Sequence, residues 1–244
     1  MAKIILGIGV AQISGKIGGS VFSRNKSGAY VRTNRKGTNP NTISQQVART
    51  KFSQGSKFFK ALSSVQQQSF KDNAINYPQV DRLGNVVTLT GSQLASKFAN
   101  LALLADTTLT PQECGSPVYV PTITTLAIGG LFTGGVIANL VLNAIITNSS
   151  GDTVDEVPAN FAFILKATKP MSAGFTAPKK ADFRVITVYS VTEAVDAVSI
   201  QSAYAAKFGS QIIGGDAKIF FSAQMVSLTT PQVSAAVVAI RPFT

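Results

Sequence analysis

The first 60 residues carry charge of only one sign. They contain eleven of the 22 Lys and Arg residues and no Asp or Glu. The other eleven Lys and Arg residues are matched by all eleven Asp and Glu residues in the rest of the chain, so the whole formal net charge of +11 lies in these 60 residues. Such a segment cannot neutralise itself, and it predicts an arm or a surface that contacts a partner.

The most basic part of this arm contains the signals of a β-hairpin. Residues 21–24 and 29–32 are short strand-forming runs on either side of the turn NKSG, in which Gly28 supplies conformational freedom. Residues 14–19 (SGKIGG) contain three glycines and are expected to be a flexible connector. A two-stranded hairpin is only marginally stable in water, so this one is expected to need a partner that orders it.

A helix is predicted after Pro40, because proline disfavours helix in the residue before it. Asn41 or Thr42 would cap this helix, which would run to about Leu62. An apolar stripe at alternating spacings of four and three is expected to face the core, and it comprises Ala48, Phe52, Gly55, Phe59 and Leu62. Phe58 lies off this stripe.

Two capping boxes mark further helices. Ser64 with Gln67 predicts a short second helix, which would form a helical hairpin with the first. Thr90 with Gln93 predicts a third helix that runs to about residue 104.

The second half of the chain changes to a period of two. No charged residue lies between Glu113 and Asp152, and residues 123–146 are long enough to cross a membrane. Four glycines interrupt this run, and its apolar residues alternate with positions that include Asn139 and Asn143. The alternation predicts a half-buried strand, and no membrane span is expected.

More strand-like runs follow, separated by turn clusters, at residues 161–165, 183–191, 218–226 and 233–240. No helical insertion is expected among them, and residues 204–216 are interpreted as a connection that crosses between sheets. This pattern favours an antiparallel β-sandwich of immunoglobulin or fibronectin type III character, with a jelly roll as the alternative.

The whole chain is therefore predicted to be an α+β protein. A basic extended arm with a β-hairpin (1–40) and a small helical domain (41–106) would precede a linker (107–117) and a C-terminal β-sandwich (118–244).

The sequence offers little for catalysis or metal binding. It has no histidine and a single cysteine, Cys114, which excludes Ser-His-Asp and Cys-His catalysis and imidazole metal sites. Asp152, Asp155 and Glu156 form the one acidic cluster, and their spacing is typical of a solvated hairpin end rather than a calcium loop. No catalytic, cofactor or metal site is predicted, and the chain is not expected to be an enzyme.

The basic arm is the candidate binding surface. The residues predicted to contact a partner are Lys16, Arg24, Lys26, Tyr30, Arg32, Arg35, Lys36 and Arg49. Tyr30 would be an aromatic anchor on the same strand face as Arg32. Two partners stay open: an acidic protein surface, or nucleic-acid phosphates, whose binding would weaken with salt at a log–log slope of about −5 if about six charges were engaged.

Residues 14–52 resemble a group of poorly characterised proteins from tailed phages of Bacteroidetes, including crAss-like phages. The group has a basic, glycine-rich start followed by a helix with the pattern N-P-x-T-x-x-Q-x-x-x-R-x-x-F, which residues 39–52 match. Ser63 and Phe70 stand where Thr and Trp are common in the group. The segment TKPMSAG (168–174) is also similar, so the resemblance covers both halves of the chain.

The resemblance implies a virion structural protein and no catalytic residue. The expected function is that of a head-associated protein (auxiliary, decoration or minor capsid) anchored to neighbouring subunits by its basic arm within a symmetric assembly. A tail or neck component, or a nucleic-acid-binding protein packaged with the genome, are the alternatives. The expected location is the virion, assembled in the cytoplasm of the bacterial host.

Overall fold

The computed structural model of the chain describes residues 2–4, 12–26, 28–34, 40–81, 83–105, 108, 110–133, 136–209 and 217–243. The chain divides into two compact units, Met1–Thr50 with Pro78–Val87 and Lys51–Tyr77 with Thr88–Thr244. The predicted domain limits near residues 40, 106 and 117 stay predictions.

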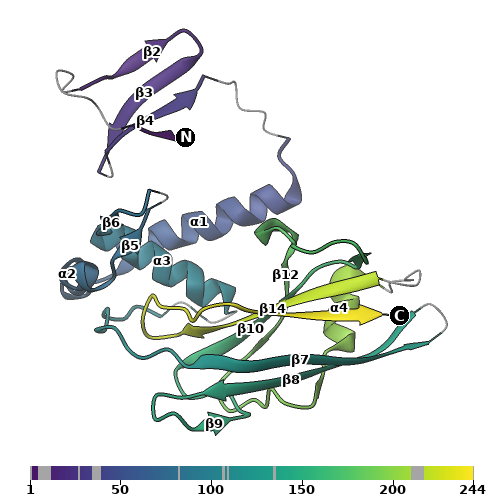
Figure 1. The fold of residues 1–244 in the computed structure, drawn as a ribbon. Coiled ribbons are helices and arrows are strands. Elements are labelled where there is room, and N and C mark those ends of the chain that lie inside the picture. Colours follow the sequence, from purple (N-terminus) through teal and green to yellow (C-terminus); the bar gives the residue numbers. More distant parts are fainter. Residues whose placement is uncertain are drawn as a thin grey trace. The chain divides into compact units, whose positions relative to one another are not determined.

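An antiparallel sheet of four strands is the main element of the first unit (Figure 1). Its strands, in spatial order, are β1 (Ala2–Lys3), β4 (Gly28–Thr33), β3 (Ser20–Asn25) and β2 (Gly15–Ile17). A separate pair of short strands, β5 (Gln79–Val80) and β6 (Val86–Val87), also belongs to this unit.

The hairpin predicted in the basic arm is confirmed, because β3 and β4 pair from Ser20 opposite Thr33 to Asn25 opposite Gly28. The flexible connector predicted for residues 14–19 is wrong. Gly15–Ile17 pair with β3 as an edge strand, and Gly18, with a φ of 55°, forms the turn between them. A tight hairpin turn needs this left-handed conformation, so the glycines here mark a turn between paired strands.

The helices predicted in residues 41–106 are confirmed as α1 (Ile43–Ala61), α2 (Ser64–Asp72) and α3 (Gly91–Leu104), with a 3₁₀ turn η1 (Asn73–Asn76) after α2. The capping box of Thr90 with Gln93 is present. The box of α2 begins one residue earlier than predicted, at Ser63. The Ser63 hydroxyl accepts a hydrogen bond from the Gln66 N–H, and the Gln66 side chain accepts one from the Ser63 N–H. The extended backbone of Ser63 is the conformation that an N-cap requires.

Three phenylalanines from different helices form the core of the helical part of the second unit. The ring centroids of Phe58 (α1), Phe70 (α2) and Phe98 (α3) lie 5.7 to 6.3 Å apart. Phe58 is only 6% exposed, whereas Phe52, which the predicted stripe included, is 70% exposed. The prediction for these two residues was therefore wrong: the buried face of α1 passes through Phe58.

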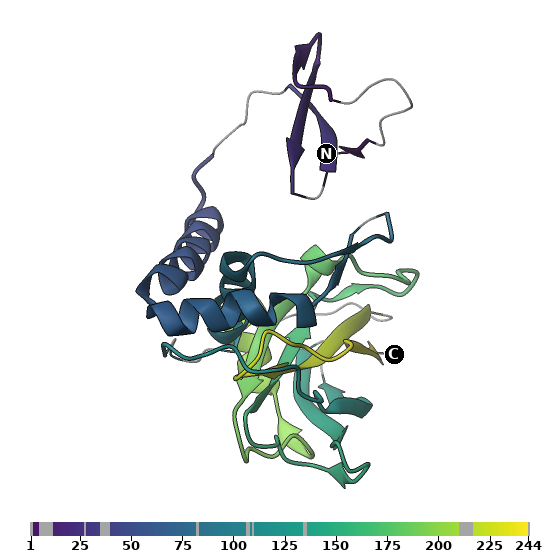
Figure 2. The same cartoon turned by 90° about the vertical axis from the view of Figure 1, so that its left-hand side faces the viewer.

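Two larger antiparallel sheets occupy much of the second unit (Figures 1 and 2). One contains β7 (Thr122–Thr133), β8 (Val136–Thr147), β9 (Thr153–Val154) and β13 (Val198–Ser199). The other contains β10 (Phe161–Ala167), β11 (Met171–Ser172), β12 (Arg184–Tyr189), β14 (Ala217–Ser227) and β15 (Val237–Phe243), with a 3₁₀ turn η2 (Lys180–Asp182) before β12.

The alternation predicted in residues 123–146 is confirmed. Leu140, Leu142 and Ala144 of β8 are fully buried, whereas Asn139 and Asn143, at the alternate positions, are partly exposed. This stretch forms strands β7 and β8, and among the described residues no helix is both long and apolar enough to cross a membrane.

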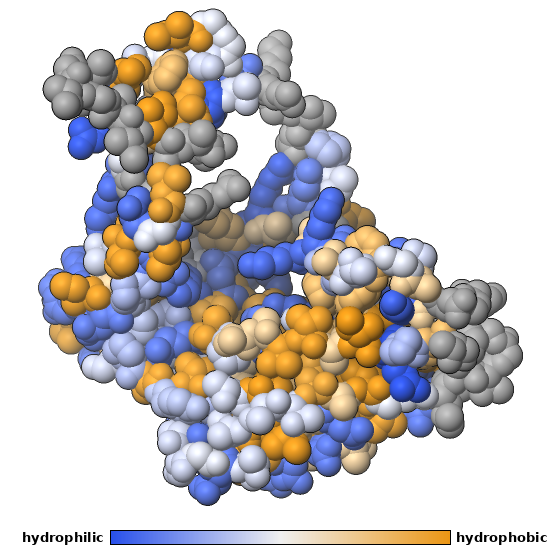
Figure 3. Space-filling view, viewed as in Figure 1, coloured by the Kyte–Doolittle hydropathy of each residue, from blue (hydrophilic) through white to orange (hydrophobic). Residues whose placement is uncertain are grey.

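The two sheets share one core. Leu140 and Leu142 of the first sheet pack in the same cluster as Phe163 and Phe221 of the second. On the other face of the second sheet, α3 packs Leu101 and Leu104 against a cluster that includes Ile164 of β10 and Val226 of β14. Strand β15 leaves apolar side chains at the surface, with Val238 and Ile240 each 53% exposed. Figure 3 shows apolar residues gathered over these C-terminal strands.

The prediction that no helix interrupts the C-terminal strands is wrong. Helix α4 (Gln201–Phe208) lies between β13 and β14 in the chain, and it occupies the first half of the predicted crossing connection. Tyr204 and Phe208 fall on one face of this helix, with ring centroids 4.9 Å apart, and both pack into the shared core. The observed architecture is therefore a mixed helix and antiparallel-sheet fold. Residues 210–216 of the predicted connection lie outside the described residues.

Candidate interaction surface

The register of the N-terminal sheet places three of the predicted contact residues on one face. Lys16 and Arg32 lie directly opposite Val21, one on each side of it. Tyr30 lies opposite Ser23, two residues along β3 from Val21. Because opposed residues share a face and alternate residues along a strand return to it, Lys16, Tyr30 and Arg32 project from the same side of the sheet.

Arg24 lies on the opposite face of this sheet. Phe22 shares that face, where it lies opposite Val31, and both are partly buried while Arg24 is exposed. Lys26, also exposed, follows β3 at the turn. The apolar pair of Phe22 and Val31 was not predicted as part of the surface, although the period-two alternation along residues 20–25 was the signal for it.

The N-terminal sheet buries very little of itself. Among its described residues Val21, at 9% exposed, is the one buried hydrophobic side chain, and Ile17 is 67% exposed. Lysine and arginine have long aliphatic stems that can cover a neighbouring apolar group while the charge stays in water, so Lys16 and Arg32 are well placed to shield Val21. A sheet with so little buried apolar area gains little stability from its own packing.

Arg49 makes a local contact just before α1. Its guanidinium donates to the Asn41 side-chain oxygen at 3.2 Å. Asn41 has a φ of 51°, so this hydrogen bond supports an unusual backbone conformation just before α1. The two other predicted contact residues, Arg35 and Lys36, lie outside the described residues.

The segment predicted as a linker is anchored to the helices. The Cys114 N–H donates to the Ser69 hydroxyl at 3.0 Å, and its carbonyl accepts from the Asn73 side chain at 2.9 Å. The Tyr77 hydroxyl donates to the Gly115 carbonyl at 2.7 Å. These contacts join residues about 40 positions apart, and no periodic pattern in the sequence could have revealed them.

Burial changes the side-chain pKa values of two residues in these contacts. It raises the pKa of the Cys114 thiol from 9.0 to about 11, and it also raises the pKa of the Tyr77 hydroxyl. Cys114 is 4% exposed. The thiol is therefore protonated and shielded in the folded protein at neutral pH, and Cys114 packs as a small buried apolar residue.

This shift predicts a loss of stability in alkali. Between pH 9 and about 11 the thiol of the unfolded chain has lost its proton while that of the folded chain retains it. The unfolded state then binds fewer protons, so the free energy of unfolding falls as the pH rises through this range. Urea unfolding at several pH values should show a shallower fall for Cys114→Ala than for the natural chain. An equal fall in the free energy of unfolding for both proteins would show that Cys114 does not cause this pH dependence.

The described residues contain no group of three or more His, Cys, Asp or Glu side chains placed to hold a metal ion. Asp155 and Glu156 are exposed, and the backbone of Glu156 forms an isolated β-bridge with Ala194.

Comparisons of the chain with protein-family models, curated proteins and solved structures find no match.

Proposed function

We propose that this chain is a bacteriophage virion structural protein, associated with the head as an auxiliary, decoration or minor capsid subunit. The N-terminal sheet would anchor it to neighbouring subunits through Lys16, Tyr30 and Arg32. One observation carries the proposal: the entire net positive charge lies in the first 60 residues. The exposure of the N-terminal sheet supports it, since the described part of that sheet buries a single hydrophobic side chain. The resemblance to tailed-phage proteins points to the virion as the location.

The face with Lys16, Tyr30 and Arg32 fits an acidic protein surface. Two exposed cations flank the apolar Val21, and a tyrosine lies next to them on the same side. Aromatic and arginine residues are enriched where protein surfaces meet, because both combine apolar area with hydrogen-bonding groups. The proposed partners are other virion proteins or further copies of this chain.

For the larger sheets we propose a sandwich arrangement with immunoglobulin or fibronectin type III character. Supporting it, both sheets are antiparallel and bury one common core. Helix α4 is an addition to such a fold.

The second candidate is a protein that binds the packaged genome. It is favoured by Arg24, which is exposed on the face opposite to Lys16 and Arg32, and by Lys26, which is exposed at the turn after β3. Phosphate contacts need charge more than they need a shaped surface. A third possibility is a structural subunit of the tail or neck, which would bind its neighbours through the same basic residues.

Binding across a salt series separates these functions. The intact protein and a form lacking residues 1–40 would be mixed with purified empty particles of the encoding phage and, separately, with duplex DNA. We expect arm-dependent binding to particles that persists at moderate salt, with weak and salt-sensitive binding to DNA. Strong binding to DNA with a steep salt dependence and none to particles would reverse the assignment.

A further inference from the structure

A groove lies beside the edge strand β12 of the second unit. Its volume is about 620 Å³. It is lined by residues 185–188 and Ser190 along β12, by residues 103–105 at the end of α3, and by Lys51 and Lys207. All of these residues belong to the same compact unit.

β12 has strand neighbours on one side only. It pairs with β10, and in the part of the chain that the structure describes no strand pairs with its other edge. An edge strand presents backbone N–H and C=O groups that can bond another extended chain. Extended peptides bind many proteins in this way, gaining affinity from the backbone and selectivity from alternate side chains.

The groove combines an apolar wall with two lysines, and Glu193 reaches one end of it, where its carboxylate accepts a hydrogen bond from the N–H of the lining residue Ser190 at 2.6 Å. Leu104, Val185 and Val188 pack against the same buried cluster and line the groove, and all three are only partly buried. Lys51 and Lys207 contribute the charge, and none of the lining residues is acidic. A strand placed along β12 would turn alternate side chains to opposite faces.

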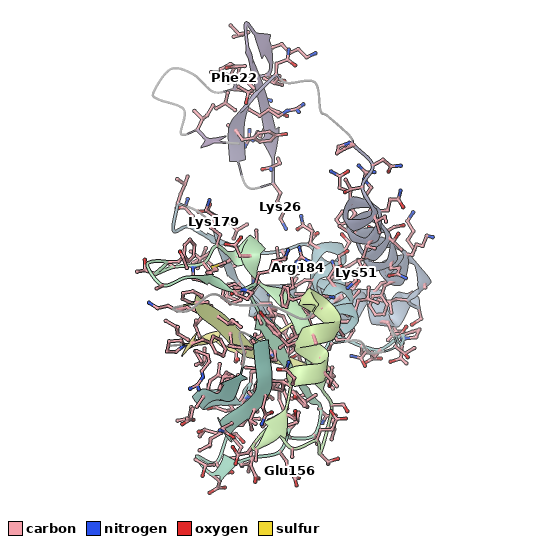
Figure 4. The ribbon with its side chains drawn as sticks, turned by 90° about the vertical axis from the view of Figure 1, so that its right-hand side faces the viewer. Phe22, Lys26, Lys51, Glu156, Lys179 and Arg184 are labelled. Carbon is pink, nitrogen blue, oxygen red and sulfur yellow. The ribbon has the colours of Figure 1, made fainter. Side chains whose placement is uncertain are left out.

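Arg184 adds to this charge at the start of β12. It is exposed, and its guanidinium carbon lies 5.9 Å from the centroid of the Phe208 ring. Figure 4 shows Lys51 and Arg184 toward one end of this unit and Glu156 at the opposite end. The charge that would complement the groove is therefore negative, and the unit's own exposed Glu156 lies away from it.

We propose that the free edge of β12 binds an extended segment of another protein chain, in which apolar residues alternate with Asp or Glu. The segment would add a strand to the sheet, with apolar side chains against Leu104 and carboxylates near the two lysines. This proposal does not depend on the virion function. The alternative is that this edge stays unpaired. The pairing of β12 with β10 has a register shift between Leu165 and Lys166, and both such irregularities and lysines near an edge can prevent another strand from pairing there.

The test uses the full chain and a blocked synthetic peptide of alternating Glu and Val. We expect this peptide to bind and to slow hydrogen exchange at the amides of residues 184–189, because the added strand would bond them. A peptide of alternating Lys and Val should not bind. The double variant Lys51→Glu with Lys207→Glu should weaken binding about tenfold or more, since two attractions become repulsions.

A matched control has the same change in net charge. Lys60 and Lys169 are exposed and do not line the groove, so Lys60→Glu with Lys169→Glu should leave the affinity within about twofold. Equal losses in both double variants would overturn the proposal, as would binding without protection of residues 184–189. No binding of the Glu-Val peptide at millimolar concentration would favour the unpaired edge and also overturn it.

Discussion

Replacing Phe58 by alanine is expected to lower the free energy of unfolding by about 3–5 kcal/mol, because it removes one of three rings that form the helical core. The centroid of the Phe58 ring lies 6.3 Å from that of Phe70 and 5.7 Å from that of Phe98, and Phe58 is 6% exposed. Its truncation would leave a cavity that the packed neighbours cannot fill. Urea unfolding followed by circular dichroism measures the loss.

Phe52 provides the control for this prediction on the same helix. It is 70% exposed, so Phe52→Ala should change the free energy of unfolding by no more than about 0.5 kcal/mol. Both substitutions bring the same gain in helix propensity, and the difference between them reports packing. A larger loss for Phe52→Ala than for Phe58→Ala would mean that the face of α1 predicted from periodicity is the buried one.

The two phenylalanines show what periodicity can and cannot decide. The apolar residues of α1 contain two overlapping stripes, and both pass through Gly55 and Leu62. The choice between them depends on the neighbouring helices: the ring centroids of Phe70 in α2 and Phe98 in α3 lie 6.3 and 5.7 Å from that of Phe58. These contacts bury the stripe that contains Phe58, and they are tertiary contacts that no local pattern encodes.

Local signals predicted local structure well in this chain. The capping box at Thr90 and the alternation through Leu140 and Leu142 both depend on residues close in sequence, and both are confirmed. The predictions were wrong where the same residue types are common in more than one kind of local structure. The glycines around residue 18 were interpreted as a flexible connector but include a turn between paired strands. The residues around Tyr204 were interpreted as a connection between sheets but form a helix that packs into the core.

The candidate surface was predicted in composition but not in arrangement. Charge counting identified Lys16, Arg24 and Arg32 equally, because the pairing of β2 with β3 was not predicted from the sequence. The β2–β3 pairing brings Lys16 across Val21 from Arg32, while the alternation of β3 turns Arg24 to the other side. The separation into faces follows from register, which a one-residue slip would reverse.

This separation leads to the second large prediction, which rests on the proposed anchoring function. The double variant Lys16→Glu with Arg32→Glu reverses both cations on the face of Tyr30. Binding to empty particles should weaken by about 30- to 100-fold, because two charges aimed at an acidic surface would be repelled by it. The variant Arg24→Glu with Lys26→Glu has the same net charge and should lose much less affinity for the particles.

If the partner is nucleic acid, both variants should instead weaken binding similarly, and each should reduce the salt slope by about 2. The comparison thus distinguishes a shaped interface from a general attraction to phosphate.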